Sequence, residues 1–480
     1  MKEESETPFT FNPAINPDDE KELGGESWFS KNKLLILILS GCLLAIIIIA
    51  VVIIIIFTIK GKNKKKNNGI IVPDVVPPSD DDDRPNHNYI RAKFIIKESS
   101  KNNVKIFSTF AKMPNNLNYS NYILGVRANN KPINITKEGT YSFEKEGNYS
   151  IEIYLLEETP ILDDFFFGCQ YLVEVDFAHF NVKHISSMIE LFEGCINLSK
   201  IYFGYDFFTE SLIKMDQLFY SCLSLTEIDL SEFDTEKVET MEDLFVNCKN
   251  LKSIKFGPKF NTSKLVSMRG MFNGCSALTS IDLSSFDTSN VEIFENLFKG
   301  CKSLVSIDTK YIKTDSGKDL TSMFEDCSSL ILLNLDHFNT ANAFDMSFMF
   351  SGCTNLQSLN LEGWDTQNVE SMQAMFRDCT KLTKLNLLNF YTPKVINMEE
   401  LFSGCSSLIY LDISNFNTSI TQDTSEMFTG IGINGTIIYD SNVLTTNIIN
   451  TIPSGWTKVE ISKLSIPDEN EENNGNNDEN

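Results

Sequence analysis

The stretch MFNGCSALTSIDLSSFDTSNV, residues 271–291, contains every part of a motif that returns ten times along this chain. A phenylalanine stands three positions before its cysteine, a leucine stands three positions after it, and the alternating run Ile281-Asp282-Leu283 follows. Successive repeat cysteines are 26 or 27 residues apart. A fixed period of this length predicts a solenoid in which each repeat forms one coil. The repeat cysteines are Cys169, Cys195, Cys222, Cys248, Cys275, Cys301, Cys327, Cys353, Cys379 and Cys405.

Each repeat contains two apolar patterns with different periods. After the cysteine, the spacing Leu-x-x-Ile-x-Leu of residues 278–283 places the last two apolar side chains on one face of a strand. Further on, Val369, Met372, Met375 and Phe376 have the spacing of one or two helical turns whose apolar side faces the core. We therefore expect an α/β solenoid, a leucine-rich-repeat coil with a long parallel β-sheet on one face and short helical turns opposite.

An aromatic residue followed by Asp or Asn and then Thr separates the two patterns. Examples are Phe233-Asp234-Thr235 and Trp364-Asp365-Thr366. We expect the aromatic ring to fill the corner of the coil, and the Asp or Asn side chain to hydrogen-bond the turning backbone.

The repeat cysteines occupy one position of the coil. Neighbouring coils about 4.8 Å apart would bring equivalent Cα atoms within disulfide range. Equivalent side chains in a stack point in parallel, however, whereas a disulfide needs converging Cβ atoms. Buried free thiols acting as small apolar groups are therefore favoured over disulfides between coils. Thiols in one line also cannot form the tetrahedron of a zinc site, so we predict no metal.

One exposed strand position, just before the last apolar residue, is rich in Asp and Asn. Stacked carboxylates at this position would hold cations weakly or recognise a basic partner. Alternatively, the short polar residues only keep a solvated sheet face soluble. We call this set the strand ladder, a candidate ligand-facing surface; it consists of Asp176, Tyr202, Asp229, Lys255, Asp282, Asp308, Asn334, Asn360, Asn386 and Asp412.

Three segments with different compositions precede the structured part of the chain. Residues 1–30 contain eight carboxylates and two lysines and are predicted to be a disordered acidic tail. Residues 34–59 are 26 uncharged residues, mostly Leu and Ile. At about 1.5 Å per residue they would cross a hydrocarbon core of about 30 Å, which predicts a transmembrane helix. Residues 60–88 form a basic and then Pro/Asp-rich linker.

The remaining boundaries follow from changes in pattern. Residues 89–157 contain short alternating runs separated by turn residues, and predict a small β-rich N-terminal cap domain that closes the first edge of the solenoid. The solenoid covers residues 160–430 and a C-terminal cap covers residues 431–462. Residues 463–480 are acidic and rich in Asn, and predict a second disordered tail.

The membrane orientation receives conflicting signals. Five lysines between Lys60 and Lys66 follow the apolar stretch, whereas only Lys31 and Lys33 directly precede it, so the positive-inside rule places the repeats in the cytoplasm. Seven possible N-glycosylation sequons would suit an extracellular domain, but chance gives a similar number in a chain so rich in Asn, Ser and Thr. They begin at Asn118, Asn134, Asn148, Asn197, Asn261, Asn417 and Asn434.

The composition argues against several classes of function. A net charge of −24 opposes nucleic-acid binding, which needs a basic face. The sequence has no P-loop, no G-x-S-x-G, no HExxH and no convincing Cys/His pair, so we predict neither an enzyme nor a cofactor. The expected partners are a membrane, through residues 34–59, and a protein or glycan ligand on the solenoid. The oligomeric state remains open.

The repeat motif resembles that of the BspA-like leucine-rich-repeat surface proteins of bacteria and some parasitic protists. The resemblance covers about residues 163–428, and residues 435–456 are similar to the way these domains end. Residues 308–311 depart from the Leu-Ser-x-Phe pattern. The resemblance implies a surface adhesion or host- and matrix-binding molecule without catalytic residues, and therefore extracellular repeats. The alternative, which the lysine count favours, is a membrane-tethered scaffold that faces the cytoplasm.

Overall fold

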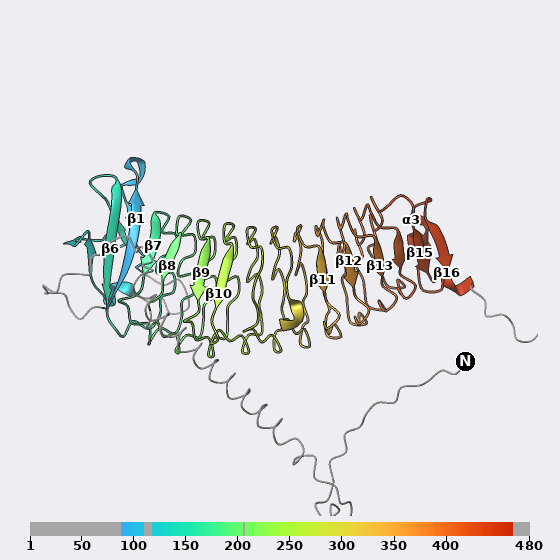
Figure 1. Cartoon of the computed structure of the whole chain (residues 1–480), viewed down its shortest axis with the longest axis horizontal. Helices are drawn as coiled ribbons and strands as arrows, with labels where there is room; N and C mark the ends of the chain where they lie inside the picture. Colours follow the sequence, from blue (N-terminus) through green and yellow to red (C-terminus); the bar gives the residue numbers. More distant parts are fainter. Residues whose placement is uncertain (1–87, 110–117, 205–206, 464–480) are drawn as a thin grey trace, which may run out of the picture. The chain divides into compact units, whose positions relative to one another are not determined.

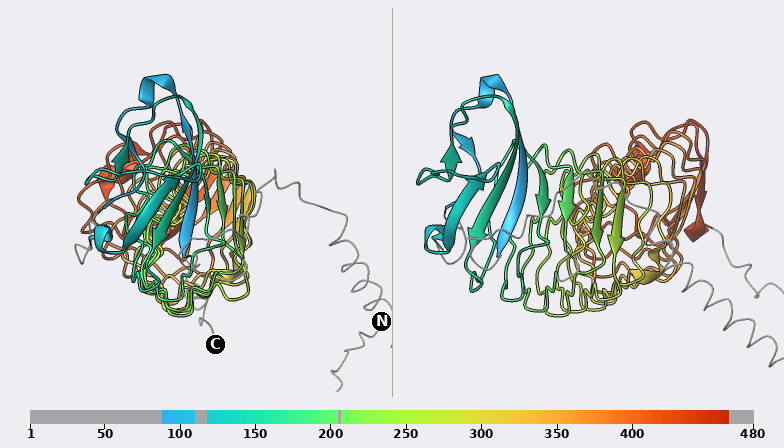
Figure 2. Two further views of the ribbon diagram at one scale, coloured as in Figure 1. Left: turned by 90° about the vertical axis from the view of Figure 1, so that its left-hand side faces the viewer. Right: turned by 60° about the vertical axis from the view of Figure 1, so that its left-hand side comes forward.

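The described part of this protein is a β-solenoid of ten coils with little helix (Figure 1). The computed structural model describes residues 88–109, 118–204 and 207–463. We number the coils by their cysteines, so coil 1 begins at Cys169 and coil 10 at Cys405. In these residues the only α-helix is α3, Thr446–Thr451, which follows the last coil. Figure 2 shows the same stack from two further directions.

The strands that follow the cysteines are short and pair mostly in twos. β7 pairs with β8, β9 with β10 and β11 with β12, all in parallel. A continuous group, β13-β14-β15-β16, ends the stack. The predicted long parallel sheet is therefore interrupted. The strands span β7 Leu172–Asp176, β8 Lys200–Tyr202, β9 Glu227–Leu230, β10 Ser253–Phe256, β11 Leu332–Asn334, β12 Ser358–Asn360, β13 Lys384–Asn386, β14 Tyr410–Asp412, β15 Thr436–Tyr439 and β16 Thr457–Glu460.

The predicted helical turns opposite the strands are absent from the described coils, and consecutive tight turns take their place. In coil 4 the backbone N–H groups alternate in direction. Those of Gly270 and Phe272 donate to carbonyls of coil 5, at 2.9 and 3.0 Å, whereas that of Asn273 donates within its own coil. Gly270 and Gly274 have φ of 61° and 75°, and such left-handed residues interrupt a right-handed helix. The i, i+3, i+6, i+7 spacing fits these turns as well as it fits a helix.

The core contains two parallel stacks that follow the repeat. One phenylalanine per coil stacks on the next from Phe166 to Phe428, with ring centroids 5.3–6.0 Å apart. The repeat cysteines are free and buried, which confirms the thiol prediction. From Cys195 to Cys405, each Sγ donates a hydrogen bond to the carbonyl of a stacked phenylalanine 29 or 30 residues earlier in the chain, as in Cys275 to Phe245 at 3.3 Å.

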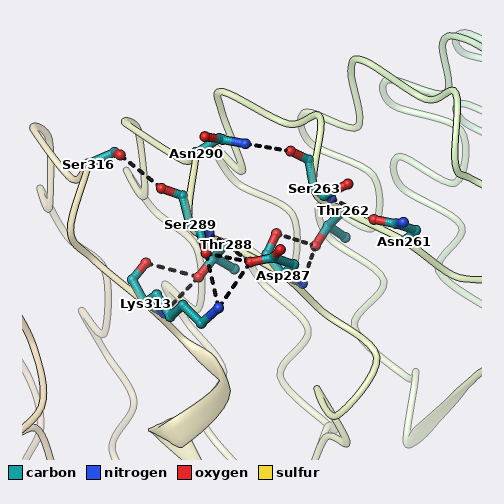
Figure 3. Close-up of polar contacts among 9 residues, drawn as sticks. All are labelled: Asn261, Thr262, Ser263, Asp287, Thr288, Ser289, Asn290, Lys313 and Ser316. Atoms are coloured by element: carbon teal, nitrogen blue, oxygen red, sulfur yellow. Dashed lines mark hydrogen bonds and ion pairs between the residues drawn. The ribbon is translucent and has the colours of Figure 1, made fainter.

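In coils 2 to 10 the corner is held by a buried threonine, two of which, Thr262 and Thr288, are drawn in Figure 3. Thr288 Oγ1 donates to the Lys313 carbonyl at 2.9 Å and accepts the Lys313 N–H at 2.7 Å, so one hydroxyl joins two coils. Asp287 accepts the N–H of Ser289 at 3.1 Å, which confirms the predicted role of this corner position. The threonines with such a hydroxyl-to-carbonyl bond are Thr209, Thr235, Thr262, Thr288, Thr314, Thr340, Thr366, Thr392 and Thr418.

The strands of residues 89–155 join the solenoid in one sheet, with the order β4-β3-β6-β1-β7-β8. β1 is antiparallel to both β6 and β7, so it covers the strand edge of coil 1. These strands and the coils belong to one compact unit, and a small domain of its own is not supported. The strands are β1 Tyr89–Ile96, β2 Val104–Lys105, β3 Ile123–Ala128, β4 Lys131–Pro132, β5 Thr140–Tyr141 and β6 Gly147–Leu155.

The end of the stack is closed by different elements. α3 follows coil 10, and Phe428 of that coil is only 5% exposed. Trp456 donates its indole N–H to the Gly432 carbonyl at 2.6 Å and so fastens the segment that leads into β16. Short 3₁₀ helices also occur, at Glu98–Ser100, Tyr119–Asn121, Thr309–Tyr311 and Ile461–Lys463.

Within the described ranges, no helix has the length and apolarity needed to cross a membrane. The predicted span at residues 34–59 and the predicted tail at 1–30 lie outside those ranges, as do nearly all of the linker at 60–88 and of the tail at 463–480.

Replacing Thr288 by Val should destabilise the solenoid. Valine has nearly the same shape but leaves the N–H and carbonyl of Lys313 without the hydroxyl, and each lost hydrogen bond costs about 0.5–1.5 kcal/mol. The urea midpoint of the full chain, followed by circular dichroism, should fall. Thr279→Val, an exposed threonine of the same coil, is the control and should change the midpoint little. Equal midpoints for the two variants would contradict the structural role of the corner threonine.

The repeat thiols should resist modification in the folded protein. Burial raises the pKa of Cys248 and Cys301 to about 12, so little reactive thiolate exists at neutral pH. Ellman's reagent should modify the ten repeat thiols only after denaturation, without prior reduction. Their rapid modification in the native chain, or a need for reductant, would be inconsistent with buried free thiols.

Candidate binding surface

The strand ladder lies on the outside of the coils, but its members differ in exposure. Asp229, Asp282 and Asn360 are exposed, whereas Asp176 is half-buried and Asp412 is only 7% exposed. Because strand pairing is interrupted, the ladder consists of separate short groups. The other exposed members are Tyr202, Lys255, Asp308, Asn334 and Asn386.

The Asp and Asn residues of the ladder have a structural role in the turn after the strand. Asp282 accepts the backbone N–H of Ser284 at 2.9 Å, and Asn334 accepts that of Asp336 at 3.1 Å. This Asx turn explains why the position favours short acceptor side chains. The same bond, from the N–H two residues further on, is made by Asp176, Asp229, Asp308, Asn360, Asn386 and Asp412.

The two exceptions, Tyr202 and Lys255, belong to the coils that contain 27 residues. In both coils a glycine stands two positions further on. A Cβ at Gly257 would lie 2.0 Å from the Ser231 carbonyl oxygen, and one at Gly204 would lie 2.8 Å from the Ala178 Cα. Where the Asx turn is missing, a longer turn containing glycine replaces it, pressed against the preceding coil.

Other outward strand positions vary from coil to coil and were not singled out by the sequence reasoning. Val305, Ile331 and Leu332 are 47%, 40% and 63% exposed, respectively, and lie in neighbouring coils 6 and 7. The sequence could have indicated them, because each is an apolar residue at a position that is polar in most repeats. A cluster of exposed apolar side chains is typical of a surface that contacts another molecule.

A cleft of about 560 Å³ opens on the strand side between coils 4 and 5. Its walls include Ile254, Phe256 and Pro258 of coil 4, and Asp282 and Ser285 of coil 5. Two ladder residues, Lys255 and Asp282, therefore line the same cleft, which the repeat pattern alone does not reveal.

The seven sequons differ in accessibility. Asn134, Asn148, Asn197 and Asn434 are exposed, but the Asn197 side-chain amide donates to the Gln170 carbonyl at 2.6 Å. The others are half-buried: Asn118, Asn261 and Asn417. Each of these three uses its side-chain oxygen to hold a local turn.

Buried or half-buried carboxylates gather on the turn side of coils 2, 3 and 5. Burial raises the pKa values of Asp216, Asp243 and Glu295, and Arg269 forms an ion pair with Asp243 at 2.9 Å. Arg269 thus forms ion pairs with two neighbouring carboxylates, those of Glu242 and Asp243. These side chains lie in turns whose backbone N–H groups already donate to the next coil. Their shifted pKa values reflect burial and neighbouring charges and do not indicate a ligand site.

Asp163, immediately before coil 1, is the most deeply buried of these acids, at 1% exposure. Burial, with the neighbouring carboxylate of Asp164, raises its pKa to about 6. Its Oδ1 accepts the Ile189 N–H at 2.9 Å, but its Oδ2 makes no hydrogen bond, and neither does the nearby Ser187 hydroxyl.

Comparisons with known proteins give a family match and distant likenesses to solved structures. The model of the family described as "Mycoplasma protein of unknown function, DUF285" matches residues 161–256, 214–331 and 318–437. No curated protein matches. A chain of the "Crystal structure of TLR13-ssRNA13 complex" is 14% identical and covers 56% of this chain, with a TM-score of 0.19. This chain covers 48% of that one, and so low a TM-score supports no argument about fold or function.

Replacing Asp163 by Asn should stabilise the protein at neutral pH. The folded-state pKa of about 6 exceeds the ordinary aspartate value of 3.8, so the buried carboxyl favours folding below pH 4 and loses that contribution as pH rises through 6. The resulting change in the free energy of unfolding is about 3 kcal/mol. Asn keeps the acceptor for Ile189 and removes the charge.

Urea midpoints measured at pH 4, 5, 6 and 7.5 should therefore separate progressively in favour of Asp163→Asn. Asp423→Asn is the control, because hydrogen bonds from Ser425 lower the Asp423 pKa, and its sign should be opposite. A constant difference between wild type and Asp163→Asn across the range would contradict the raised pKa.

Proposed function

The chain belongs to the family described as "Mycoplasma protein of unknown function, DUF285", and from this premise we propose that it is a membrane-anchored binding protein displayed on the cell surface. In this proposal the solenoid binds a protein or glycan of a host, a matrix or another cell. Residues 34–59 form the single membrane span, and the linker at 60–88 separates the span from the solenoid. Adhesion is the expected outcome of binding.

One observation carries this proposal: the repeated residues are buried, and the outward strand residues differ between coils. Leu278, Phe272 and Cys275 of one repeat are all 0% exposed, so the shared motif is used for packing. The equivalent outward position is Lys200 in coil 2, Leu332 in coil 7 and Lys384 in coil 9. A scaffold that repeats its core and varies one face is suited to recognition.

The proposed orientation follows the resemblance to BspA-like surface proteins rather than the lysine count. The rival is a membrane-tethered scaffold that faces the cytoplasm, and the five lysines between Lys60 and Lys66 support it. Both proposals use the same solenoid face, so the side of the membrane is what separates them.

Intact cells that express the chain should become labelled by a membrane-impermeant biotin ester on lysines of the solenoid, such as Lys200 and Lys384, which are exposed. Mass spectrometry should find the same modified peptides in intact and permeabilised cells. Labelling that requires permeabilisation would favour the cytoplasmic scaffold and reject surface display. A cytoplasmic enzyme of the same cells serves as the control for membrane integrity.

In a host that N-glycosylates secreted proteins, the same orientation predicts glycans on the most accessible sequons. Asn134, Asn148 and Asn434 are exposed. The triple variant with Gln at these three positions should lose most of the mobility shift caused by peptide N-glycosidase. An unmodified wild-type chain in such a host would count against a lumenal solenoid.

A further inference from the structure

We infer that the cleft between coils 4 and 5 is a pocket for a basic side chain, above all the guanidinium of arginine, presented by a protein or peptide ligand. The inference rests on the proposed binding function and gives it a site. It depends on three features of the cleft: the local separation of the two coils, an ionised carboxylate at the opening, and an unpaired hydroxyl in the wall.

The cleft exists because the strand sides of coils 4 and 5 are not paired by backbone hydrogen bonds, although the Ser276 hydroxyl donates to the Lys249 carbonyl at 3.1 Å. β9 and β10 pair in parallel, and the Thr235 N–H donates to the Lys259 carbonyl at 3.1 Å, so coil 4 is tied to coil 3. No backbone hydrogen bond in the described ranges joins residues 249–260 to residues 276–287. The close approach of Gly257 to Ser231 holds the longer turn of coil 4 against coil 3, which leaves space toward coil 5.

The charge of the cleft favours a cation. Lys255 at its edge is already paired, because its Nζ lies 2.9 Å from Asp229 Oδ2 and 3.2 Å from Ser231 Oγ on the coil 3 side. Asp282 is exposed and forms no ion pair with any described residue. The N–H of Ser284 lowers the Asp282 pKa, so the carboxylate is ionised at neutral pH. The free charge at this opening is therefore negative.

The walls suit the rest of a long basic side chain. Ile254, Phe256 and Pro258 supply apolar surface against which methylene groups can pack. Ser285 lines the coil 5 wall, and its hydroxyl oxygen is buried without a hydrogen-bond partner. Guanidinium has five N–H donors in a planar fork, so one carboxylate and one hydroxyl can be satisfied together. The whole chain, with a net charge of −24, adds a favourable field for such a ligand.

Asp282→Asn is a sharp test because the neighbouring repeats show that Asn folds at this position. Asn334, Asn360 and Asn386 make the same Asx turn in coils 7 to 9. The substitution therefore removes the charge and keeps the turn. Asp412→Asn is the control, because Asp412 has the same ladder position in coil 10 and makes the same Asx turn but lies outside the cleft lining. Ser285→Ala removes the unpaired hydroxyl independently.

The experiment uses the full chain in mild detergent and two small probes, N-acetyl-arginine amide and its uncharged analogue N-acetyl-citrulline amide. Dissociation constants come from saturation-transfer NMR. The arginine probe should bind about two- to fivefold more tightly than the citrulline probe, as expected for an exposed carboxylate–guanidinium pair. Asp282→Asn should abolish most of that preference, Ser285→Ala should weaken arginine binding, and Asp412→Asn should change neither.

Equal affinity for the two probes, no binding of the arginine probe, or equal losses in Asp282→Asn and Asp412→Asn would overturn the inference. Circular dichroism of each variant verifies the fold. The outcome is separable from the proposed function, since surface labelling of intact cells does not depend on Asp282. Surface display without arginine binding would reject only the arginine pocket. Arginine binding without surface display would reject only the proposed location at the cell surface.

Discussion

The hydrogen bonds between successive coils are the constraint on which the rest of this structure depends. On the turn side, alternate backbone N–H groups donate to the next coil from coil 1 through coil 9, while the intervening ones close turns within their own coil. At the corner, the buried threonine hydroxyl donates one hydrogen bond to the next coil and accepts another from it. These bonds fix the spacing of the coils even where the strands do not pair, so the strand side is free to open locally.

That spacing accounts for the residues that repeat most strictly. A ring placed once per coil must lie over the ring of the next coil, which explains the continuous phenylalanine stack. A cysteine at the neighbouring position is small, apolar and still able to donate to the carbonyl of a stacked phenylalanine 29 residues earlier, as between Cys405 and Phe376 at 3.0 Å. Ten cysteines in one chain are thus a packing and hydrogen-bonding feature, and burial suppresses their redox reactivity.

The same reasoning divides the strand ladder into structure and candidate function. Asp and Asn recur because their side chains close the turn after the strand, and the coils that lack them need one more residue and a glycine. Recognition of a ligand can therefore depend only on which ladder residues are exposed and on the side chains that lie beside them. The apolar group around Leu332 and the cleft at Asp282 are places where a particular coil departs from its neighbours, and specificity in a solenoid arises from such departures.

The sequence by itself determined the solenoid, the number of its coils, the aromatic corner with its Asp or Asn, and the free buried thiols, because each of these follows from a residue type recurring at a fixed period. The helical turns predicted for the turn side were wrong, because apolar residues such as Met372 and Phe376 have the same spacing in a helix and in a run of tight turns. Only the tertiary structure decided between them, through left-handed residues and hydrogen bonds to the next coil. It alone also located the interruptions of strand pairing and the cleft between coils 4 and 5, because these depend on how two coils approach each other.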